Sequence, residues 1–488
     1  MPGVSLMPTL QQCDSASSSW GRDAPHWLTE KIKRGGNVSI LVLGASGSCG
    51  RWSRIGQFHS SHRQKPPAYP DATVLLPDGA GDCGDRAECN PLHSKSAAVF
   101  PTWNAWPTHL EKLLRSCWEN ERVHVRNQWC REQPASGTAM LVGVAAAKPE
   151  TFDADVVLLE TANNDLPADT PAFREQALAT NEILATQLRE LPLARLPFVM
   201  FLETSWRYAA RGQHVSGEEW QLQALRRHQL AHTSLTPITA ALHESHKATA
   251  PKGGWLPNVY FQDLTHPSRF GQKLIAGVVA RRLTSQLVAR LAAPSTESTD
   301  GAKLLHDGPS ERQFLTEQAS AFFSVANAAR SLLDFTDPSA HRSFVVHKSG
   351  FARQEDVAGK PGFIAKAIGA ELVVRLPPSS VAALIGPLCT YENAGALELA
   401  LVTVPAATSS SSCPDYARAA KAGSRVVLST VDTLWAAKAS LHWWLPTGLS
   451  AAHAAPCMWL AMRVVNAEPP RQEHKVKLLA LLVSHSSD

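Results

Sequence analysis

Strand-like runs alternate with helix-like segments over the first 291 residues of the chain. Three of these runs are almost continuously apolar, and a fourth alternates apolar and polar residues: Asn37–Leu43, Val156–Glu160, Pro197–Leu202 and Arg122–Asn127. Continuous apolar runs of this length are typical of strands buried on both faces, as in a parallel sheet covered by helices. The later strands begin about 30 to 40 residues apart, which leaves room for a crossover helix. The sequence therefore predicts an α/β fold with a mostly parallel sheet.

The segments between and around these strands are expected to supply the helices. Their composition and apolar spacing predict five of them: 25–33, 108–118, 173–191, 218–233 and 269–291. Residues 57–101 are rich in Pro, Gly, Asp and His, so we expect a long loop or insertion there. Residues 1–35 are polar with a Ser cluster, which predicts a partly disordered leader around one short helix. The α/β domain is expected to cover residues 36–292.

The pattern changes after Ala293–Pro309, whose composition is typical of a linker. We expect a linker at 293–312 and a second domain at 313–488. Short strand-like runs recur there between turn signals: 343–347, 371–376, 381–385, 397–404, 425–428, 459–465 and 475–483. Helical patterns are sparse beyond about residue 333, apart from a short turn at 415–421, so we predict an antiparallel β-sandwich. Four tryptophans are expected in its core and at its edges rather than in a sugar-stacking platform: Trp435, Trp443, Trp444 and Trp459.

Charge and composition narrow the possible partners and compartments. The net charge is +4 and no basic stripe with interleaved aromatics occurs, which argues against a nucleic-acid partner. The apolar run Met140–Ala147 is far too short for a membrane span. The first residues lack the basic and apolar regions of a signal peptide, so a cytoplasmic location is the default, and secretion is expected only if the N-terminus is incomplete. The nine cysteines include no CxxC pair; Cys83 and Cys89 are either a local disulfide or two surface thiols.

Polar residues suited to acyl transfer follow three of the predicted strands and precede the last predicted helix. Ser46 comes directly after the first strand, and a serine attacks a carbonyl only when a base accepts its proton. His266 is the candidate base, with Asp263 three residues before it to hold the imidazole in the right tautomer. Gly137 and Asn164 follow the second and third strands and could supply N–H donors to an oxyanion.

Each of these segments also has a simpler explanation. Asp263 could be a helix cap and Ser46 a turn residue. The loop Gly44–Gly50 could be taken for a phosphate-binding loop, but it lacks the GxGxxG spacing and the lysine of a P-loop. Five histidines in predicted loops show no HExxH pattern, so no metal site is expected: His59, His62, His93, His243 and His246. No cofactor is expected either. The four active-site segments are favoured because they occur together, in order.

That order resembles the SGNH (GDSL-type) hydrolase superfamily over about residues 36–291. The first block of the family, GDSxTxG, corresponds to Gly44–Gly50, and the third block, GxND, corresponds to Ala162–Asp165. The fifth block, DxxHPSxxG, is matched in full by Asp263–Gly271, and the second block is matched only by Gly137. Two positions depart from the pattern, because Ala45 stands where the family has Asp and Ala162 stands where it has Gly.

The resemblance implies a flavodoxin-like, three-layer α/β/α fold and a serine esterase mechanism. Ser46 would be the nucleophile, His266 the general base and Asp263 its orienting partner. The oxyanion hole would consist of the Ser46 N–H, the Gly137 N–H and the Asn164 side chain. The family suggests an ester substrate, a small molecule or an acetyl group on a carbohydrate. The C-terminal half also resembles the β-sandwich that follows SGNH domains in some algal and plant-like proteins. The alternative is a catalytically inactive carbohydrate- or protein-binding protein that keeps this fold.

Overall fold

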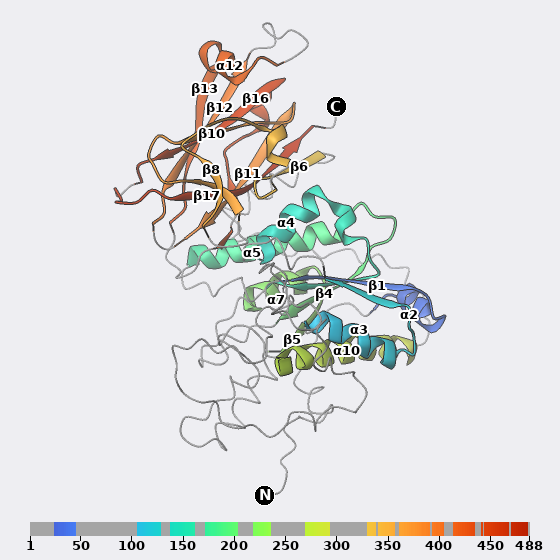
Figure 1. Ribbon diagram of the computed structural model, residues 1–488. Helices are drawn as coiled ribbons and strands as arrows, with labels where there is room; N and C mark the ends of the chain where they lie inside the picture. The colour runs from blue at the N-terminus through green and yellow to red at the C-terminus, as the bar shows by residue number, and fades with distance from the viewer. Residues whose placement is uncertain are drawn as a thin grey trace, which may run out of the picture.

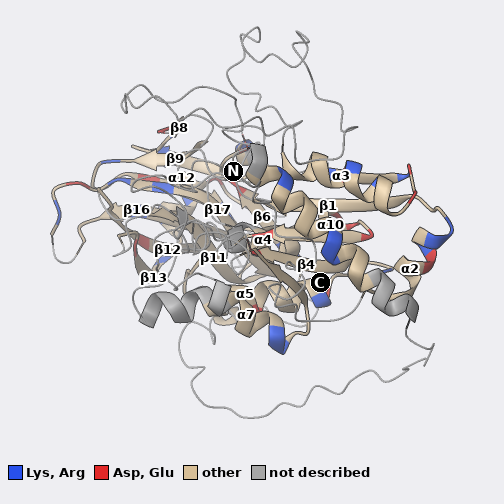
Figure 2. Cartoon of the chain, turned by 90° about the horizontal axis from the view of Figure 1, so that it is seen from below, with Lys and Arg blue, Asp and Glu red and all other residues tan. Residues whose placement is uncertain are grey.

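A parallel α/β unit and an antiparallel β-sandwich make up the fold of the chain (Figure 1). The computed structural model describes residues 24–44, 105–127, 137–161, 171–203, 218–235, 269–292, 329–337, 340–356, 361–390, 393–404, 413–434, 441–442, 444–467 and 470–486. In this part of the chain, basic and acidic residues are scattered over both units (Figure 2). None of its helices is long and apolar enough to cross a membrane.

The α/β unit is built on five parallel strands: β1 (Val38–Gly44), β2 (Val123–Asn127), β3 (Val156–Glu160), β4 (Phe198–Glu203) and β5 (Ala231–Ser234). Their order in the sheet is β2-β1-β3-β4-β5. This is the flavodoxin-like order, in which the direction of strand addition reverses between β1 and β3. The predicted α/β class is confirmed, and so are the four predicted strands.

Helices cover both faces of this sheet. One face packs on α2 (His26–Lys33), α3 (Trp106–Cys117) and α10 (Arg269–Ala292), and the other on α4 (Gly137–Ala147), α5 (Pro171–Arg189) and α7 (Glu218–Arg227). Figure 1 shows the resulting three layers. Alternate residues of each strand reach opposite layers; in β1, Ile40 and Val42 face the first set of helices, while Leu41 and Leu43 face the second. Both faces are therefore buried, which explains the continuous apolar runs.

The helix predicted at 218–233 is too long. It ends at Arg227, and the segment then turns into β5, whose four residues are all buried. Gln229 adopts a left-handed conformation with φ of 52°, and the N–H of Leu230 bonds back to the carbonyl of Leu225, which closes the helix as a Schellman-type end. Asparagine or glycine usually occupies such a position, so a glutamine there gives no signal in the sequence.

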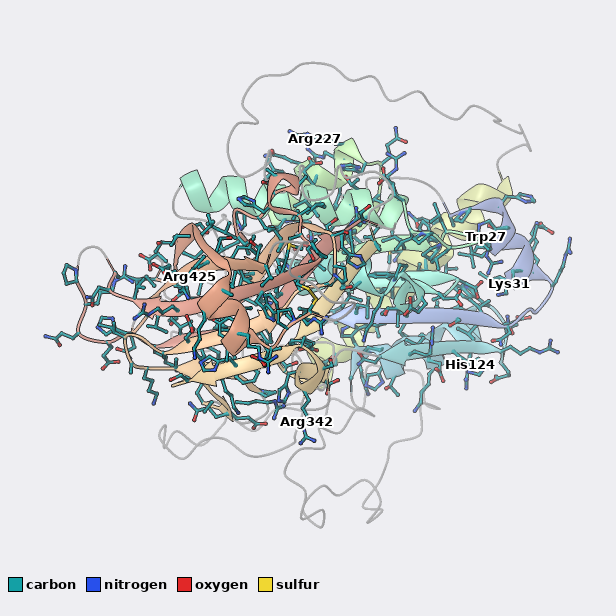
Figure 3. All side chains as sticks on the ribbon, turned by 90° about the horizontal axis from the view of Figure 1, so that it is seen from above. Trp27, Lys31, His124, Arg227, Arg342 and Arg425 are labelled. Atoms are coloured by element: carbon teal, nitrogen blue, oxygen red, sulfur yellow. A yellow bond between two sulfur atoms is a disulfide. The ribbon has the colours of Figure 1, made fainter. Side chains whose placement is uncertain are left out.

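The edge of the sheet where the strands begin is held together by Asp155. Its buried carboxylate accepts hydrogen bonds from the Lys31 ammonium at 2.7 Å, from the Arg195 guanidinium at 2.6 Å and from the backbone N–H of Ser39 at 2.8 Å. The guanidinium of Arg195 also stacks 4.0 Å above the ring of Trp27. Trp27 and Lys31 both come from α2 (Figure 3). The short helix in the predicted leader is therefore confirmed, and it packs onto the α/β core through Ala24 and Leu28.

The β-sandwich consists of strands from residue 329 onward: β6 (Ala329–Asp334), β7 (Val345–Ser349), β8 (Ala352–Glu355), β9 (Pro361–Ala365), β10 (Glu371–Arg375), β11 (Ser380–Cys389), β12 (Ala396–Val404), β13 (Ser424–Asp432), β14 (Leu441–His442), β15 (Leu445–Pro446), β16 (Cys457–Val465) and β17 (Val476–His485). One sheet has the order β13-β12-β16-β10-β7, and the other has β14-β11-β17-β9-β8 with β15 and β6 beside it. All these strands pair antiparallel, as predicted. The side chains between the sheets form one apolar core. The proposed domain boundaries at 292 and 313 stay predictions.

A disulfide between Cys413 and Cys457 joins the segment before α12 (Tyr416–Ala422) to the start of β16. The helix covers the outer face of its sheet, and Trp459 is buried there with only 1% of its surface exposed. Trp459 is thus a core residue, as predicted, although it lies under α12 rather than between the sheets. The disulfide itself was not anticipated, because an odd number of widely spaced cysteines gives no pairing.

Replacing Cys413 with serine is expected to destabilise the sandwich. The disulfide closes a loop over a sequence separation of 44 residues. Such a loop contributes roughly 4 kcal/mol in the chain-entropy model, and measured values are typically about 2–4 kcal/mol. Urea unfolding followed by tryptophan fluorescence should show this loss without reductant, and reductant should remove the difference between the variant and wild type. Cys117→Ser changes an exposed free thiol and is the control, expected within about 0.5 kcal/mol of wild type. Equal stability of all three chains would contradict the prediction.

Candidate active site

The topology of the sheet indicates where a ligand would bind. In open α/β sheets, ligands bind outside the carboxyl ends of the strands, at the point where strand order reverses. Here that point lies between β1 and β3, and the last residues of these strands, Gly44 and Glu160, are aligned in register. Gly44 directly precedes the Ala45–Ser46 segment, and Glu160 directly precedes the segment that contains Asn164.

Of the five candidate residues, the structure describes one. Gly137 is the first residue of α4. Because α4 leads through the turn Pro149–Phe152 into the start of β3, the first residue of α4 lies toward the carboxyl edge of the sheet. Ser46, Asn164, Asp263 and His266 lie outside the described residues, as do Ala45 and Ala162. Their neighbours in the chain are described, and these are the ends of β1 and β3 and the start of α10.

The start of α10 is held at the same edge by α3. The side chain of Gln272, in the first turn of α10, accepts a hydrogen bond from the backbone N–H of Trp106 at 2.8 Å, and Gln272 is fully buried. Further along the two helices, the indole of Trp118, just after the last residue of α3, donates to the Thr284 hydroxyl of α10 at 3.1 Å. The two helices therefore run side by side in the same direction. Since α3 leads into the beginning of β2, both helices start at the carboxyl edge.

A buried polar network holds the residue that follows β3. The amide of Gln221, on α7, donates to the hydroxyl of Thr161 at 2.5 Å and to the side-chain oxygen of Asn181, on α5, at 3.4 Å. All three side chains are at most 2% exposed. Three elements are thus joined immediately before the segment that carries Asn164. An apolar helix pattern does not reveal such a network, because each of its members looks like a surface polar residue.

Two buried carboxylates at this edge were missed by the sequence analysis. Glu160 is the last residue of β3 and is 1% exposed, and Glu203 is the last residue of β4 and is fully buried. The signal was present, because each apolar strand ends on an acidic residue (VVLLE and FVMFLE). A carboxylate at the buried end of a strand requires hydrogen-bond donors. Both side chains have interaction partners within the protein, and they belong to the buried structure that supports this edge.

His232 is a histidine of the sheet itself, in the strand next to β4. It lies in β5 and is fully buried. Burial, together with the nearby positive charges of Arg226 and Arg282, lowers the pKa of its imidazole from 6.5 to about 3. A group with so low a pKa stays neutral at pH 7 and is a weak proton acceptor, far from the value that suits a general base. His232 is thus a structural residue, and it does not compete with His266 for the role of base.

The described residues contain no cluster of three or more His, Cys, Asp or Glu side chains that could hold a metal ion. The five histidines considered above for a metal site all lie outside the described part of the chain: His59, His62, His93, His243 and His246.

No protein-family model matches the chain, and no curated protein sequence matches it. Among solved structures, the chain is similar to a two-domain esterase active on acetylated mannans, with 13% identity, a TM-score of 0.51, and coverage of 98% of this chain and 99% of that one. The same kind of esterase co-crystallised with mannopentaose gives 12% identity and a TM-score of 0.49 over 98% and 99% of the two chains. A family 29 carbohydrate-binding module covers 33% of this chain and 90% of its own length, with 8% identity and a TM-score of 0.22. The first of these similarities shows that this chain shares the two-domain fold, a parallel α/β unit followed by a β-sandwich.

Proposed function

We propose that this protein is an ester hydrolase of the SGNH type that cleaves an acetyl ester on a carbohydrate through an acyl-enzyme on Ser46. The observation that carries the proposal is the meeting of separate elements at one edge of the sheet. The ends of β1 and β3 and the starts of α4 and α10 are all found there. Each of these ends coincides with a motif residue or lies within a few residues of one in the sequence.

Chain length limits how far the motif residues can lie from this edge. Ser46 follows Gly44 by two residues, so it is within roughly 7 Å of it, since extended chain spans at most about 3.3–3.6 Å per residue. His266 precedes Arg269 by three residues, and Asn164 follows Glu160 by four, which allow at most about 11 Å and 14 Å. These limits are compatible with a nucleophile, a base and an oxyanion donor that act on one substrate.

The proposed mechanism needs no group beyond side chains, backbone and water. The Oγ of Ser46 attacks the acetyl carbonyl carbon while Nε2 of His266 accepts the hydroxyl proton. Asp263 accepts the hydrogen bond from Nδ1 and stabilises the imidazolium. The N–H groups of Ser46 and Gly137 and the amide of Asn164 stabilise the oxyanion. His266 then returns the proton to the departing sugar hydroxyl. A water molecule, deprotonated by the same His266, hydrolyses the acetyl-enzyme and releases acetate.

The two-domain fold supports the proposed substrate class. The solved esterase that shares this fold over nearly its whole length is active on acetylated mannans. A sugar acetyl ester is therefore the substrate class that this similarity supports.

Labelling with a fluorophosphonate probe tests the proposal directly. The folded chain is expected to react, and fragmentation of tryptic peptide 35–51 should locate the adduct on Ser46 rather than on Ser39 or Ser48. Release of acetate from acetylated mannan should accompany labelling and should stop when the probe has reacted fully. A chain that folds, as judged by circular dichroism, but neither labels nor releases acetate would refute the enzyme.

The second candidate is a catalytically inactive binding protein on the same fold. It is favoured by Ala45, which stands where the family motif has an aspartate next to the nucleophile. On this hypothesis the chain binds acetylated mannan in a pull-down but does not react with the probe. The same labelling experiment therefore separates the two functions.

We further propose that the chain folds in an oxidising compartment. Disulfides such as Cys413–Cys457 persist in secreted and extracellular proteins and are rare in the cytosol. Of the two locations considered from the sequence, the cytoplasm and secretion, the disulfide favours secretion. Mass spectrometry of the native protein under alkylating conditions should find both cysteines oxidised, and two free thiols at these positions would argue for the cytoplasm.

A further inference from the structure

Helix α4 lies between the parallel sheet and the β-sandwich (Figure 1). Its sequence, GTAMLVGVAAA, is apolar on every side, which is typical of a helix buried all round. On one side it packs on residues of β1 and β3, and on the other it contacts β6 of the sandwich. The same apolar cluster contains Leu332, Leu384 and Leu482 from the sandwich. The two units thus share a core.

Trp444 is the side chain through which the sandwich meets the helix backbone. A Cβ atom added to Gly143, in the middle of α4, would lie 2.8 Å from Cζ2 of Trp444 and 3.6 Å from Cδ1 of Leu332. Real Cβ contacts are almost never shorter than 3.0 Å, so only glycine lets α4 come this close. Trp444 was expected in the core or at the edge of the sandwich; it lies instead in the cluster shared with the α/β unit.

A second glycine lies close to the same indole. A Cβ atom on Gly386, in β11, would lie 3.1 Å from Cζ3 of Trp444 and would collide with the ring of His442. The rings of His442 and Trp444 are themselves in contact, with centroids 4.8 Å apart. Trp444 therefore packs closely against two glycines that belong to different units, and against the ring of His442.

We infer that Trp444 is a positioning residue, which sets the position of α4 and so of the Gly137 N–H in the oxyanion hole. The inference rests on the proposed function, since it concerns how that oxyanion hole is held. Gly137 starts the helix only six residues before Gly143, a rise of about 9 Å at 1.5 Å per residue. A helix this short moves as a rigid rod, so a shift at Gly143 moves the N–H donors at its start. The sandwich thereby acts as part of the catalytic scaffold, in addition to any role in binding sugar.

Two substitutions crowd the indole. Gly143→Ala forces α4 and Trp444 apart, and Gly386→Ala crowds the ring pair of His442 and Trp444. Each is expected to lower kcat for p-nitrophenyl acetate by roughly 10- to 100-fold, the scale of a misplacement of about 1 Å or less, with KM within about twofold. The rate of fluorophosphonate labelling should fall in parallel. Trp444→Phe, which removes the crowding atoms of the larger ring, should restore most of kcat in the Gly143→Ala background.

Leu384→Val is the matched control, because it loosens the same apolar cluster without crowding α4. It should lower the melting temperature but leave kcat within about twofold. An active wild type whose kcat is unchanged by both glycine substitutions, each verified as folded, would overturn the inference and leave the proposed function intact. A wild type that neither labels nor hydrolyses would overturn the proposed function, and the inference with it. If Gly143→Ala fails to fold, the test is made with kcat of Gly386→Ala and of the double variant Gly386→Ala/Trp444→Phe.

Discussion

Ser46→Ala is expected to reduce kcat for p-nitrophenyl acetate by at least about 10³-fold. The remaining rate is that of a binding site and oxyanion hole without a nucleophile. The reason is that the hydroxyl is the atom that attacks, and no neighbouring group replaces it in forming an acyl-enzyme. Loss of the serine or the histidine of such a triad typically costs far more than loss of the orienting carboxylate. His266→Ala should therefore match Ser46→Ala, while Asp263→Asn should be milder.

The design separates catalysis from folding. Ser48→Ala lies in the same Gly/Ser segment, two residues further on, and should keep activity within a few-fold of wild type. The double variant Ser46→Ala/His266→Ala should be no slower than either single variant, because residues that act as a unit are not additive. Steady-state hydrolysis and circular dichroism of wild type and the five variants provide the comparison. Full activity in Ser46→Ala would exclude it as nucleophile, and additive losses would show that the two residues do not act together.

The sequence predicted the parts of the fold that rest on local pattern. Strands such as Val156–Glu160 are recognisable because burial on both faces requires an unbroken apolar run, and the long helix at 269–291 has a clear boundary after Pro267–Ser268. Strand β5 was missed because its sequence, AHTS, is four residues long and half polar, and only its pairing with β4 makes it a strand. Helix α4 was missed as a helix because a segment buried all round has no amphipathic period.

The active site was predictable only as a set of segments. The motif order along the chain indicated which loops belong together, and the strand order β2-β1-β3 supplies the edge where they meet. The sequence shows Glu160 and Glu203 at the ends of apolar strands, but their burial needed the structure, since burial of a carboxylate is a property of its neighbours in space. The contact between Gly143 and Trp444 could not be predicted either, because 301 positions separate them and a lone glycine in an apolar run has many explanations.

The second prediction concerns acid stability and rests on two histidines. His442 and His232 are both fully buried. Neither ring nitrogen of His442 has a hydrogen-bond partner among the described residues. Burial lowers the pKa of His442 from 6.5 to about 3, and His232 is lowered to the same value by burial and by Arg226 and Arg282. In the unfolded chain each imidazole binds a proton near pH 6.5, whereas in the folded chain it stays neutral down to about pH 3.

In this pH range only the unfolded state binds these protons, so the folded state becomes less stable as the pH falls. Above pH 6.5 both states are neutral at these positions and the effect is absent. Between about pH 6 and pH 4, each histidine should lower the free energy of unfolding by about 1.4 kcal/mol per pH unit, so the pair costs roughly 3 kcal/mol per unit. His442→Leu removes one of these protons, and adding His232→Leu removes the other. Each step should flatten the pH dependence by about one proton, while stability at pH 7.5 changes far less.

Urea unfolding at pH 7.5, 6, 5 and 4.5 measures these slopes for wild type, the single variant and the double variant. Titration of other histidines contributes equally to all three chains and cancels in the difference between them. Leu482→Val, in the apolar cluster shared by the two units, is the control: it should lower the free energy of unfolding by about 1 kcal/mol at every pH and leave the slope unchanged. If His442→Leu instead keeps the wild-type slope, His442 is already protonated or solvated in the folded chain. The indole of Trp444 would then rest against a ring that water can reach, and the shared core would be looser at this point than the contacts with Gly143 and Gly386 indicate.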